Sequence, residues 1–247
     1  MMLAVYSLWR RDVVRFLRQP SRVVGALATP ILFWFVIGSG LGSSFAEEGG
    51  FLQYYFPGSL ALIVLFTAIF STISVIEDRQ EGFLQGVLAS PAPRVAIVLG
   101  KALGSTTLAV LNGVAFLALY PLAGLSPGFG DLLATVACVA LLGLALSGLG
   151  LMIAWPLQSA QGFHAIMNLV LVPLWLLSGA LFPLSGAAPW VQALMRLNPM
   201  TPAVDVLRML LAGGAAADLP SAAAIVGGFA IVTLGVATLL VSRPVRN

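Results

Sequence analysis

Charged residues are scarce in this chain. Only 9% of its 247 residues are Asp, Glu, Lys or Arg, whereas 60% are hydrophobic. A soluble globular domain has about 25% charged residues, so this composition excludes an ordinary water-soluble fold. Cysteine and histidine are limited to Cys138 and His164. A single cysteine excludes a disulfide within the chain and a single histidine excludes a histidine metal cluster, so we expect no metal site.

Catalytic signatures are lacking as well. In a phosphate-binding loop, G-x-x-x-x-G-K-S/T, the lysine is followed by Ser or Thr, but here Ala102 follows Lys101 and Val95 occupies the position of the first glycine. No Asp or Glu lies deep within an apolar run, where ion-driven transporters carry ionisable groups. We therefore expect no catalytic residue, no ATP bound through such a loop and no cofactor held by this chain.

Long apolar runs are what the sequence has instead. A helix needs about 20 apolar residues to cross the hydrocarbon core of a bilayer. Six runs near this length predict transmembrane spans at 23–42, 54–76, 95–121, 132–154, 163–184 and 221–242. We predict an all-α integral membrane protein in which residues 1–247 form a single transmembrane domain of six helices.

The N-terminal residues 1–22 are basic and amphipathic. Arg11, Arg15, Arg18 and Arg22 recur at helical spacing. A basic amphipathic helix lies in the headgroup region of an anionic leaflet, so we predict an interfacial helix. A plain basic flank of the first span is the alternative. Lys101, one to two turns inside the third span, is expected to snorkel toward the headgroups.

The distribution of positive charge predicts the orientation. Short cytoplasmic loops carry an excess of Lys and Arg. With the N-terminus in the cytoplasm, only Arg196 and Arg208 fall outside, and all the other basic residues fall on inner flanks and loops. We predict a multi-pass protein of the bacterial inner membrane with both termini in the cytoplasm.

Two segments do not span. Residues 77–94 begin with charged residues and continue with an apolar stripe of Phe83, Leu84, Val87 and Leu88. This pattern favours a short amphipathic helix that lies against the membrane or a partner, although a solvated loop has the same composition.

The second segment, 185–220, lies on the outer side. Pro189 and Pro202 each suit the first turn of a helix, and Asn198-Pro199 suits the break between two helices. A helix over 189–197 would be about 13 Å long, which is too short to cross a core of about 30 Å. We predict a re-entrant hairpin of two short helices, 189–197 and 202–211, that dips into the outer leaflet and returns.

These segments carry a family resemblance. Residues 77–101 resemble the first cytoplasmic loop of the ABC-2 family, the membrane subunits of type-2 ABC exporters. The matching features are the charged cluster from Glu77 to Glu81, Gly82, the stripe from Leu84 to Leu88, Ser90-Pro91, Arg94 and Gly100-Lys101. The family's second motif matches Phe182-Pro183, Leu197-Asn198-Pro199 and the Asp-x-x-Arg from Asp205 to Arg208. Gln85 departs from the family, in which an acidic residue is common there.

The resemblance implies a permease dimer, homo- or heteromeric, bound to separate ATP-binding cassette ATPase subunits that hold ATP and Mg²⁺. It implies an ATPase-coupling segment with the residues Glu77, Asp78, Arg79, Glu81, Gly82, Phe83, Leu84, Leu88, Ser90 and Pro91. It implies an outer hairpin with the residues Pro183, Asn198, Pro199, Asp205 and Arg208. The partners are then the ATPase, a second permease and the lipid membrane, with no nucleic acid.

The function that follows is that of a permease subunit of an ATP-driven exporter. Family members export drugs, lipids, polysaccharide precursors or natural products, and the apolar spans favour an amphiphilic or hydrophobic cargo. An ion-driven secondary transporter and a non-transporting membrane scaffold are the alternatives. Dependence on an ion gradient, or a neighbouring gene for a soluble ATPase, would discriminate among them.

Overall fold

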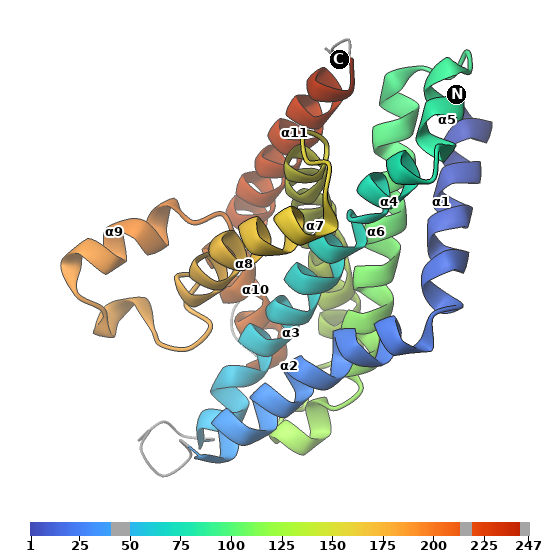
Figure 1. The fold of residues 1–247 in the computed structure, drawn as a ribbon. Coiled ribbons are helices and arrows are strands. Elements are labelled where there is room, and N and C mark those ends of the chain that lie inside the picture. Colours follow the sequence, from blue (N-terminus) through green and yellow to red (C-terminus); the bar gives the residue numbers. More distant parts are fainter. Residues whose placement is uncertain (41–49, 213–218, 243–247) are drawn as a thin grey trace.

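The computed structural model describes residues 1–40, 50–212 and 219–242, with the backbone alone at 21–23. These residues form helices, turns and loops, and no strand occurs among them (Figure 1). The α-helices are α1 (Met2–Leu17), α2 (Pro20–Gly40), α3 (Gly50–Ser71), α4 (Ser74–Gln80), α5 (Phe83–Ala89), α6 (Arg94–Leu117), α7 (Phe129–Ala154), α8 (Ala160–Leu176), α9 (Pro189–Leu197), α10 (Met200–Ala212) and α11 (Leu219–Ser242). Two short 3₁₀ helices are η1 (Tyr120–Ala123) and η2 (Leu184–Gly186).

Helix α3 forms the centre of the bundle. Every residue from 55 to 65 in this helix is buried, because α2, α6 and α7 pack around it. A helix that is covered on several sides has apolar residues on all of its faces, as α3 has. Helix α11 lies along α7, and α1 lies along the first half of α6 (Figure 1).

The composition and length of the helices are those of a multi-pass membrane protein. Four helical stretches are long and apolar enough to cross a membrane, namely Gly50–Gln80, Arg94–Leu117, Phe129–Ala154 and Leu219–Ser242. Two apolar helices are shorter, at Val24–Gly40 and Ala160–Leu176. These helices are consistent with the predicted integral membrane class, and the count of six spans stays a prediction.

Several helix boundaries differ from the predicted spans. Helix α8 ends at Leu176, well before residue 184, because the chain turns at Ser178 and Gly179, which has φ +80°. Helix α6 ends at Leu117 and gives way to η1. The predicted second span is divided by a turn at Thr72 and Ile73 into α3 and α4.

Some predicted features fall where the structure gives no description. The predicted end of the first span at 41–42 and residues 213–218 of the outer segment lie outside the described residues. The same is true of the side chain of Arg22 and of Arg243 and Arg246.

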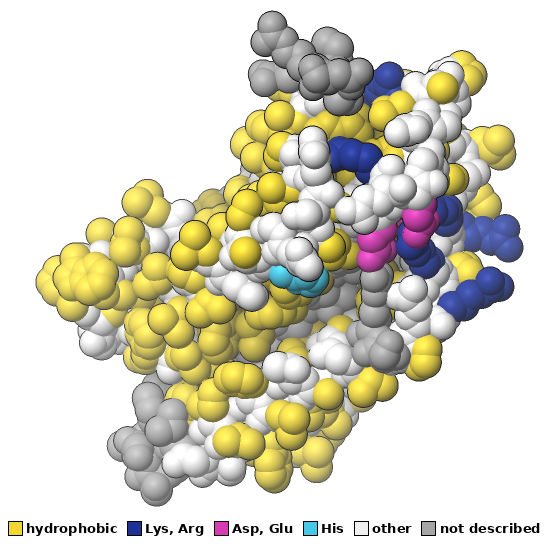
Figure 2. Space-filling model, in the orientation of Figure 1, with side chains coloured by type: hydrophobic (Ala, Val, Ile, Leu, Met, Phe, Trp, Pro, Cys, Tyr) yellow, Lys and Arg dark blue, Asp and Glu magenta, His cyan; other side chains and the backbone are white. Residues whose placement is uncertain are grey.

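The N-terminus, the end of α11, the short helices α4 and α5 and the visible acidic side chains lie toward one end of the bundle (Figure 1 and Figure 2). The N-terminus and the end of α11 lie at the same end as α4 and α5 (Figure 1). Helix α9 projects away from the side of the bundle, whereas α10 packs on α7, α11 and α3. Hydrophobic side chains cover much of the face seen in Figure 2, and the acidic side chains visible there lie together with basic ones near α1, α4 and α5.

Candidate functional site

A buried ion cluster connects three helices at the end that carries α4 and α5. Lys101 of α6 donates hydrogen bonds to Asp12 of α1, at 2.9 Å, and to Asp78 of α4, at 2.5 Å. The lysine side chain is only 2% exposed and that of Asp78 is fully buried. The expectation that Lys101 snorkels toward the headgroups is therefore wrong, because two buried carboxylates hold its ammonium group inside the protein.

Two arginines of α1 complete the cluster. Arg11 and Arg15 lie 2.6 Å and 3.1 Å from one carboxylate oxygen of Asp78, while Lys101 binds the other oxygen. Arg15 also pairs with Glu81, at 2.6 Å. Asp78 thus receives hydrogen bonds from three cations on two helices, which satisfies a charge that would be costly to bury alone. We call Asp12, Asp78, Lys101, Arg11 and Arg15 the ion cluster.

Glycines allow the cluster to close. A Cβ atom at Gly100 would lie 2.8 Å from Cβ of Leu8, and one at Gly104 would lie 3.2 Å from Cβ of Asp12. The small-xxx-small pattern at these positions therefore lets α1 approach α6 closely enough for Asp12 to reach Lys101. Burial raises the pKa of Asp12 above its ordinary value of 3.8, and the adjacent Lys101 opposes that rise.

Arg79 points away from the ion cluster, although it follows Asp78 directly. Its guanidinium group donates to the carbonyl oxygens of Trp155, at 2.6 Å, and Leu157, at 2.8 Å. These carbonyls belong to the turn between α7 and α8. The neighbouring Gln80 donates to the carbonyl of Gln158, at 3.0 Å.

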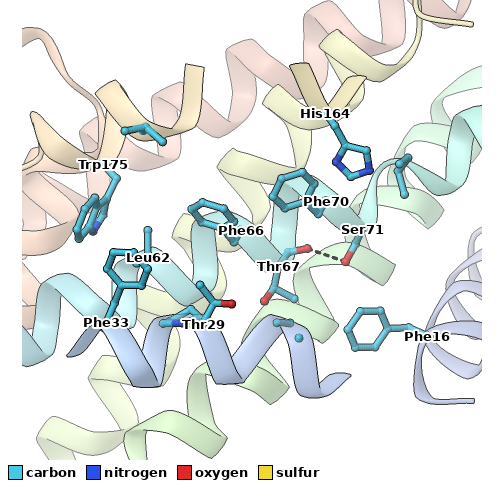
Figure 3. Close-up of a pocket in the computed structure, with 15 residues that line it drawn as sticks. Phe16, Thr29, Phe33, Leu62, Phe66, Thr67, Phe70, Ser71, His164 and Trp175 are labelled. Atoms are coloured by element: carbon cyan, nitrogen blue, oxygen red, sulfur yellow. Dashed lines mark hydrogen bonds between the residues drawn. The ribbon is translucent and has the colours of Figure 1, made fainter. Parts of the chain in front are cut away.

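An apolar cavity of about 530 Å³ lies between the end of α1 and helices α2, α3 and α8 (Figure 3). Aromatic rings dominate its lining, which includes Phe16, Phe33, Phe66, Phe70 and Trp175. The few polar side chains there are Thr29, Thr67, Ser71 and His164.

The cavity has two unlike parts. In Figure 3, His164 and Ser71 lie on one side, with the imidazole ring 5.2 Å from the ring of Phe70. Phe33, Leu62 and Trp175 lie on the other side, which is apolar. Space of this size and lining suits a ligand that is mainly hydrophobic and carries some polar groups.

Helix α8 meets α3 by a close backbone contact. Trp175 donates its indole N–H to the carbonyl oxygen of Gly58, at 2.9 Å. A Cβ atom at Gly58 would lie only 2.7 Å from Cβ of Ala180. The glycine therefore sets the distance between α3 and the chain that leaves α8.

The residues 189–212, which we call the hairpin, combine apolar packing of α10 with polar contacts that are mainly to backbone carbonyls. Asn198 donates to the carbonyl of Leu174, at 2.6 Å, and its own side-chain oxygen accepts from the amide of Met200, at 2.9 Å. Arg208 donates to the carbonyl of Gly179, at 2.8 Å, and lies 4.2 Å from the centre of the Tyr54 ring. The break between α9 and α10 lies at Asn198-Pro199, where the sequence places it.

The structure separates the residues predicted for the coupling segment, 77–94. Asp78 and Leu84 are buried, Glu77, Arg79 and Leu88 are partly buried, and Glu81, Gly82, Phe83, Ser90 and Pro91 are exposed. The segment forms α4 and α5, joined at Gly82 with φ +78°. Leu84 is thus a packing residue, so a docking partner would meet the exposed side of α5.

The predicted hairpin residues are also divided. Asn198 is buried, Pro183, Pro199 and Arg208 are partly buried, and Asp205 is exposed and 3.5 Å from Arg208. Sequence reasoning missed Asp12 and Arg11 as partners of the coupling segment. The available signal was that Asp12 is the one acidic residue among the first 46 positions, in a helix that is otherwise basic.

Comparison with protein families decides the class. A family model described as "ABC-2 type transporter" matches residues 4–212. The chain belongs to the ABC-2 type transporter family. Members of this family are membrane subunits of ABC transporters, and the match covers the ion cluster, the coupling segment, the cavity and the hairpin.

Curated relatives agree with this assignment. The chain is similar to "Nodulation protein J" of Rhizobium leguminosarum bv. trifolii, with 28% identity over 218 residues, which is 86% of this chain and 83% of that protein. The "Nodulation protein J" of Rhizobium leguminosarum bv. viciae is 25% identical over 96% of this chain and 93% of its own length. The "Probable multidrug ABC transporter permease YbhR" of Escherichia coli (strain K12) is 27% identical over 66% of this chain and 45% of its own length. This ABC-2 chain is therefore a transporter permease.

Proposed function

We propose that this chain is the membrane-spanning permease subunit of an ATP-driven exporter. It crosses the membrane six times with both termini in the cytoplasm, pairs with a second permease of the same or another kind, and moves its cargo past the aromatic cavity. ATP and Mg²⁺ are held by separate ATPase subunits that dock on the coupling segment. The hairpin covers the outer end of the path.

The anchoring of Asp78 is the observation that supports this proposal best. Helix α4, at the start of the coupling segment, is fixed to α1 and α6 by Lys101, Arg11 and Arg15, all within 3.1 Å of the one buried carboxylate of Asp78. Ion pairs at an exposed surface contribute little stability. A loop without a mechanical role therefore has no need of a buried carboxylate that binds three cations. A segment that receives force from a docked ATPase does need one.

The lining of the cavity supports an apolar or amphiphilic cargo. An ion-driven transporter needs an ionisable group on the cargo path. Of the lining residues, His164 is the one with an ionisable side chain, and no member of the ion cluster is among them. The lining therefore favours transport that is driven by a partner chain over transport that is driven by ions bound in this cavity.

The test is co-purification with the ATPase encoded beside this chain's gene, followed by ATP hydrolysis. Gly86 lies in α5, is exposed, and has no atom within 4 Å of an added Cβ. Gly86→Trp places a large ring on the docking side of α5 without disturbing the fold. We expect it to reduce ATPase association at least about tenfold, which corresponds to about 1.4 kcal/mol.

Gly130→Trp is the matched control. Gly130 lies near the start of α7, is exposed, and also has no atom within 4 Å of an added Cβ. It should leave association unchanged. Equal binding of the ATPase to both variants would refute docking on α5, and transport that stops when the ion gradient is collapsed, with ATP present, would support the ion-driven alternative.

A further inference from the structure

Arg79 connects the coupling segment to a different part of the molecule from Asp78. Its two terminal nitrogens bind the carbonyl oxygens of Trp155 and Leu157, and its guanidinium carbon lies 5.3 Å from the Trp155 ring. Asp78, the preceding residue, binds α1 and α6. Two adjacent residues of α4 therefore bind two different parts of the bundle, α1 and α6 on the one hand and the turn after α7 on the other.

The turn after α7 provides a suitable site for an arginine. The C-terminal end of a helix carries a partial negative charge, and the carbonyls of Trp155 and Leu157 lie just beyond the end of α7. Helix α7 ends at Ala154, and Pro156 lacks an N–H group. A planar guanidinium group binds two oxygens at once, whereas a lysine ammonium group is a point charge. In the described part of the chain Arg79 has no carboxylate within ion-pair distance, so these carbonyls are its principal partners.

The same turn leads directly into the cavity wall. Ser159 begins α8 by accepting a hydrogen bond from the amide of Gly162, at 3.1 Å. Helix α8 then carries His164, Val172 and Trp175 on the cavity lining. Helix α6, to which Asp78 is tied, contributes no residue to that lining. A displacement of α4 thus reaches the cavity wall of α8 through the two hydrogen bonds of Arg79, with the single bond from Gln80 to the carbonyl of Gln158 beside them.

We propose that Arg79 is the positioning residue that transmits movement of the coupling segment to α8, through the turn at residues 155–159. This inference rests on the proposed function. The ion cluster keeps α4, α1 and α6 together as one unit, and Arg79 makes α8 follow that unit when an ATPase moves it.

The link is first measured on the permease alone, in a Cys138→Ala background. Spin labels are attached at positions 85 and 161, which are exposed residues of α5 and α8. We expect one narrow distance distribution, and in Arg79→Gln a distribution at least about twice as wide, because two charge-assisted hydrogen bonds are lost. Arg94→Gln is the matched control, since Arg94 also donates to a carbonyl, that of Leu88 at 3.0 Å, but within its own segment.

The second measurement uses the complex with the ATPase. Labels at positions 161 and 242, on α8 and α11, report the displacement of α8 when a non-hydrolysable ATP analogue is added. Arg79→Gln should reduce this displacement by at least about half while ATP hydrolysis stays within about twofold of the unchanged complex, a separation that a purely structural defect does not produce.

A second variant keeps the test decisive if Arg79→Gln folds poorly. Two glycines inserted between Gln158 and Ser159 retain every hydrogen bond of Arg79 but slacken its connection to α8. We expect the same loss of displacement. If both variants move α8 as the unchanged complex does, Arg79 transmits nothing and the inference is wrong. If the unchanged chain binds no ATPase, or shows no displacement with the nucleotide analogue, the proposed function fails and the inference fails with it.

Discussion

The ion cluster and the hairpin are held by different kinds of interaction. In the ion cluster, oppositely charged side chains from α1, α4 and α6 meet at 2.5 to 3.1 Å, and the members at its centre are almost fully buried. In the hairpin, Arg208 binds one carbonyl, an aromatic ring and the exposed Asp205, at 3.5 Å, and its buried Nε has no partner among the described residues. Helix α9 exposes 69% of Trp190 and 81% of Leu197.

This difference has a mechanical meaning. A charge pair in a medium of low polarity is costly to separate, so the ion cluster holds its helices in one arrangement. Helix α9 takes part in no such cluster among the described residues, and Met195 is its one buried residue. The ion cluster is therefore rigid, whereas α9 is lightly fastened although α10 is packed into the bundle. Under the proposed function, the rigid end receives force from the ATPase and α9 is the part free to move for the cargo.

Lys101→Met should have the largest effect on stability. The substitution removes the hydrogen-bonded cation of the buried Asp12, leaving only Arg11, at 3.8 Å, among the described residues, and removes one of the three partners of Asp78. Breaking a buried ion pair costs about 3–5 kcal/mol. We expect a loss of that size in the free energy of unfolding, measured in mixed micelles, and Asp12→Asn combined with Lys101→Met should recover part of it.

The loss should depend on pH. The pKa of Asp12 is raised by burial, and removal of Lys101 takes away what opposes that rise. A carboxyl group with a raised pKa in the folded state favours folding when it is protonated, and this contribution disappears as the pH rises through the raised pKa. The penalty of Lys101→Met should thus be smaller at about pH 5 than at about pH 8. An equal penalty at both values would contradict a charged Asp12 at the centre of the cluster.

Two glycine substitutions sharpen the comparison. Gly58→Ala forces α3 away from Ala180, and Gly100→Ala forces α6 away from Leu8. Overpacking costs about 1–3 kcal/mol, and a helical Gly→Ala exchange returns up to about 1 kcal/mol. We expect Gly100→Ala to be the more destabilising, because it also separates Asp12 from Lys101.

Gly227→Ala serves as their control. An added Cβ there meets no atom within 4 Å, so thermal unfolding should show no loss of stability. If Gly58→Ala lowers stability more than Gly100→Ala does, the contact of α1 with α6 is stabilised mainly by apolar packing and not by the pair of Asp12 and Lys101.

Arg208→Gln should have the smallest effect among the substitutions at these contacts. It removes the hydrogen bond to Gly179 and the contact with Tyr54, which together stabilise by about 1–2 kcal/mol. We expect faster amide exchange in α9 and α10 and little change in α4 and α5. Arg196→Gln, at an exposed position of α9, should stay within about 0.5 kcal/mol of the unchanged protein. A loss from Arg208→Gln as large as that from Lys101→Met would remove the distinction between the two regions.

The sequence predicts what depends on local composition. Apolar runs indicate the main helices, and Asn198-Pro199 indicates the break between α9 and α10. The predicted fifth span extends to residue 184, although α8 ends at Leu176. The prediction is too long because Leu177, Ala180 and Leu181 continue the apolar run beyond the helix. No local signal shows that Gly179 turns the chain or that Ala180 packs on Gly58, since both depend on tertiary contact.

The sequence predicts the contacts of the candidate site less well than it predicts the helices. Residues 77–94 stood out because charge is rare in this chain, and the structure places Asp78 at the centre of the ion cluster. Lys101 was misread because a lysine near a helix end usually reaches water. Its partner Asp12 lies 89 positions away, a pairing that no periodic pattern reveals. Arg79 was named as a residue of the coupling segment, but the sequence gives no signal of its contacts, since its partners are backbone carbonyls.

The ion cluster also bears on how the chain is made. All five of its charged members, from Arg11 to Lys101, are synthesised before α7 begins at Phe129. Their charges can therefore neutralise one another while the later helices have still to enter the bilayer. Lys101, which would be costly to insert alone, need never face lipid without Asp12 and Asp78, so the order of synthesis itself protects the most charged part of the permease.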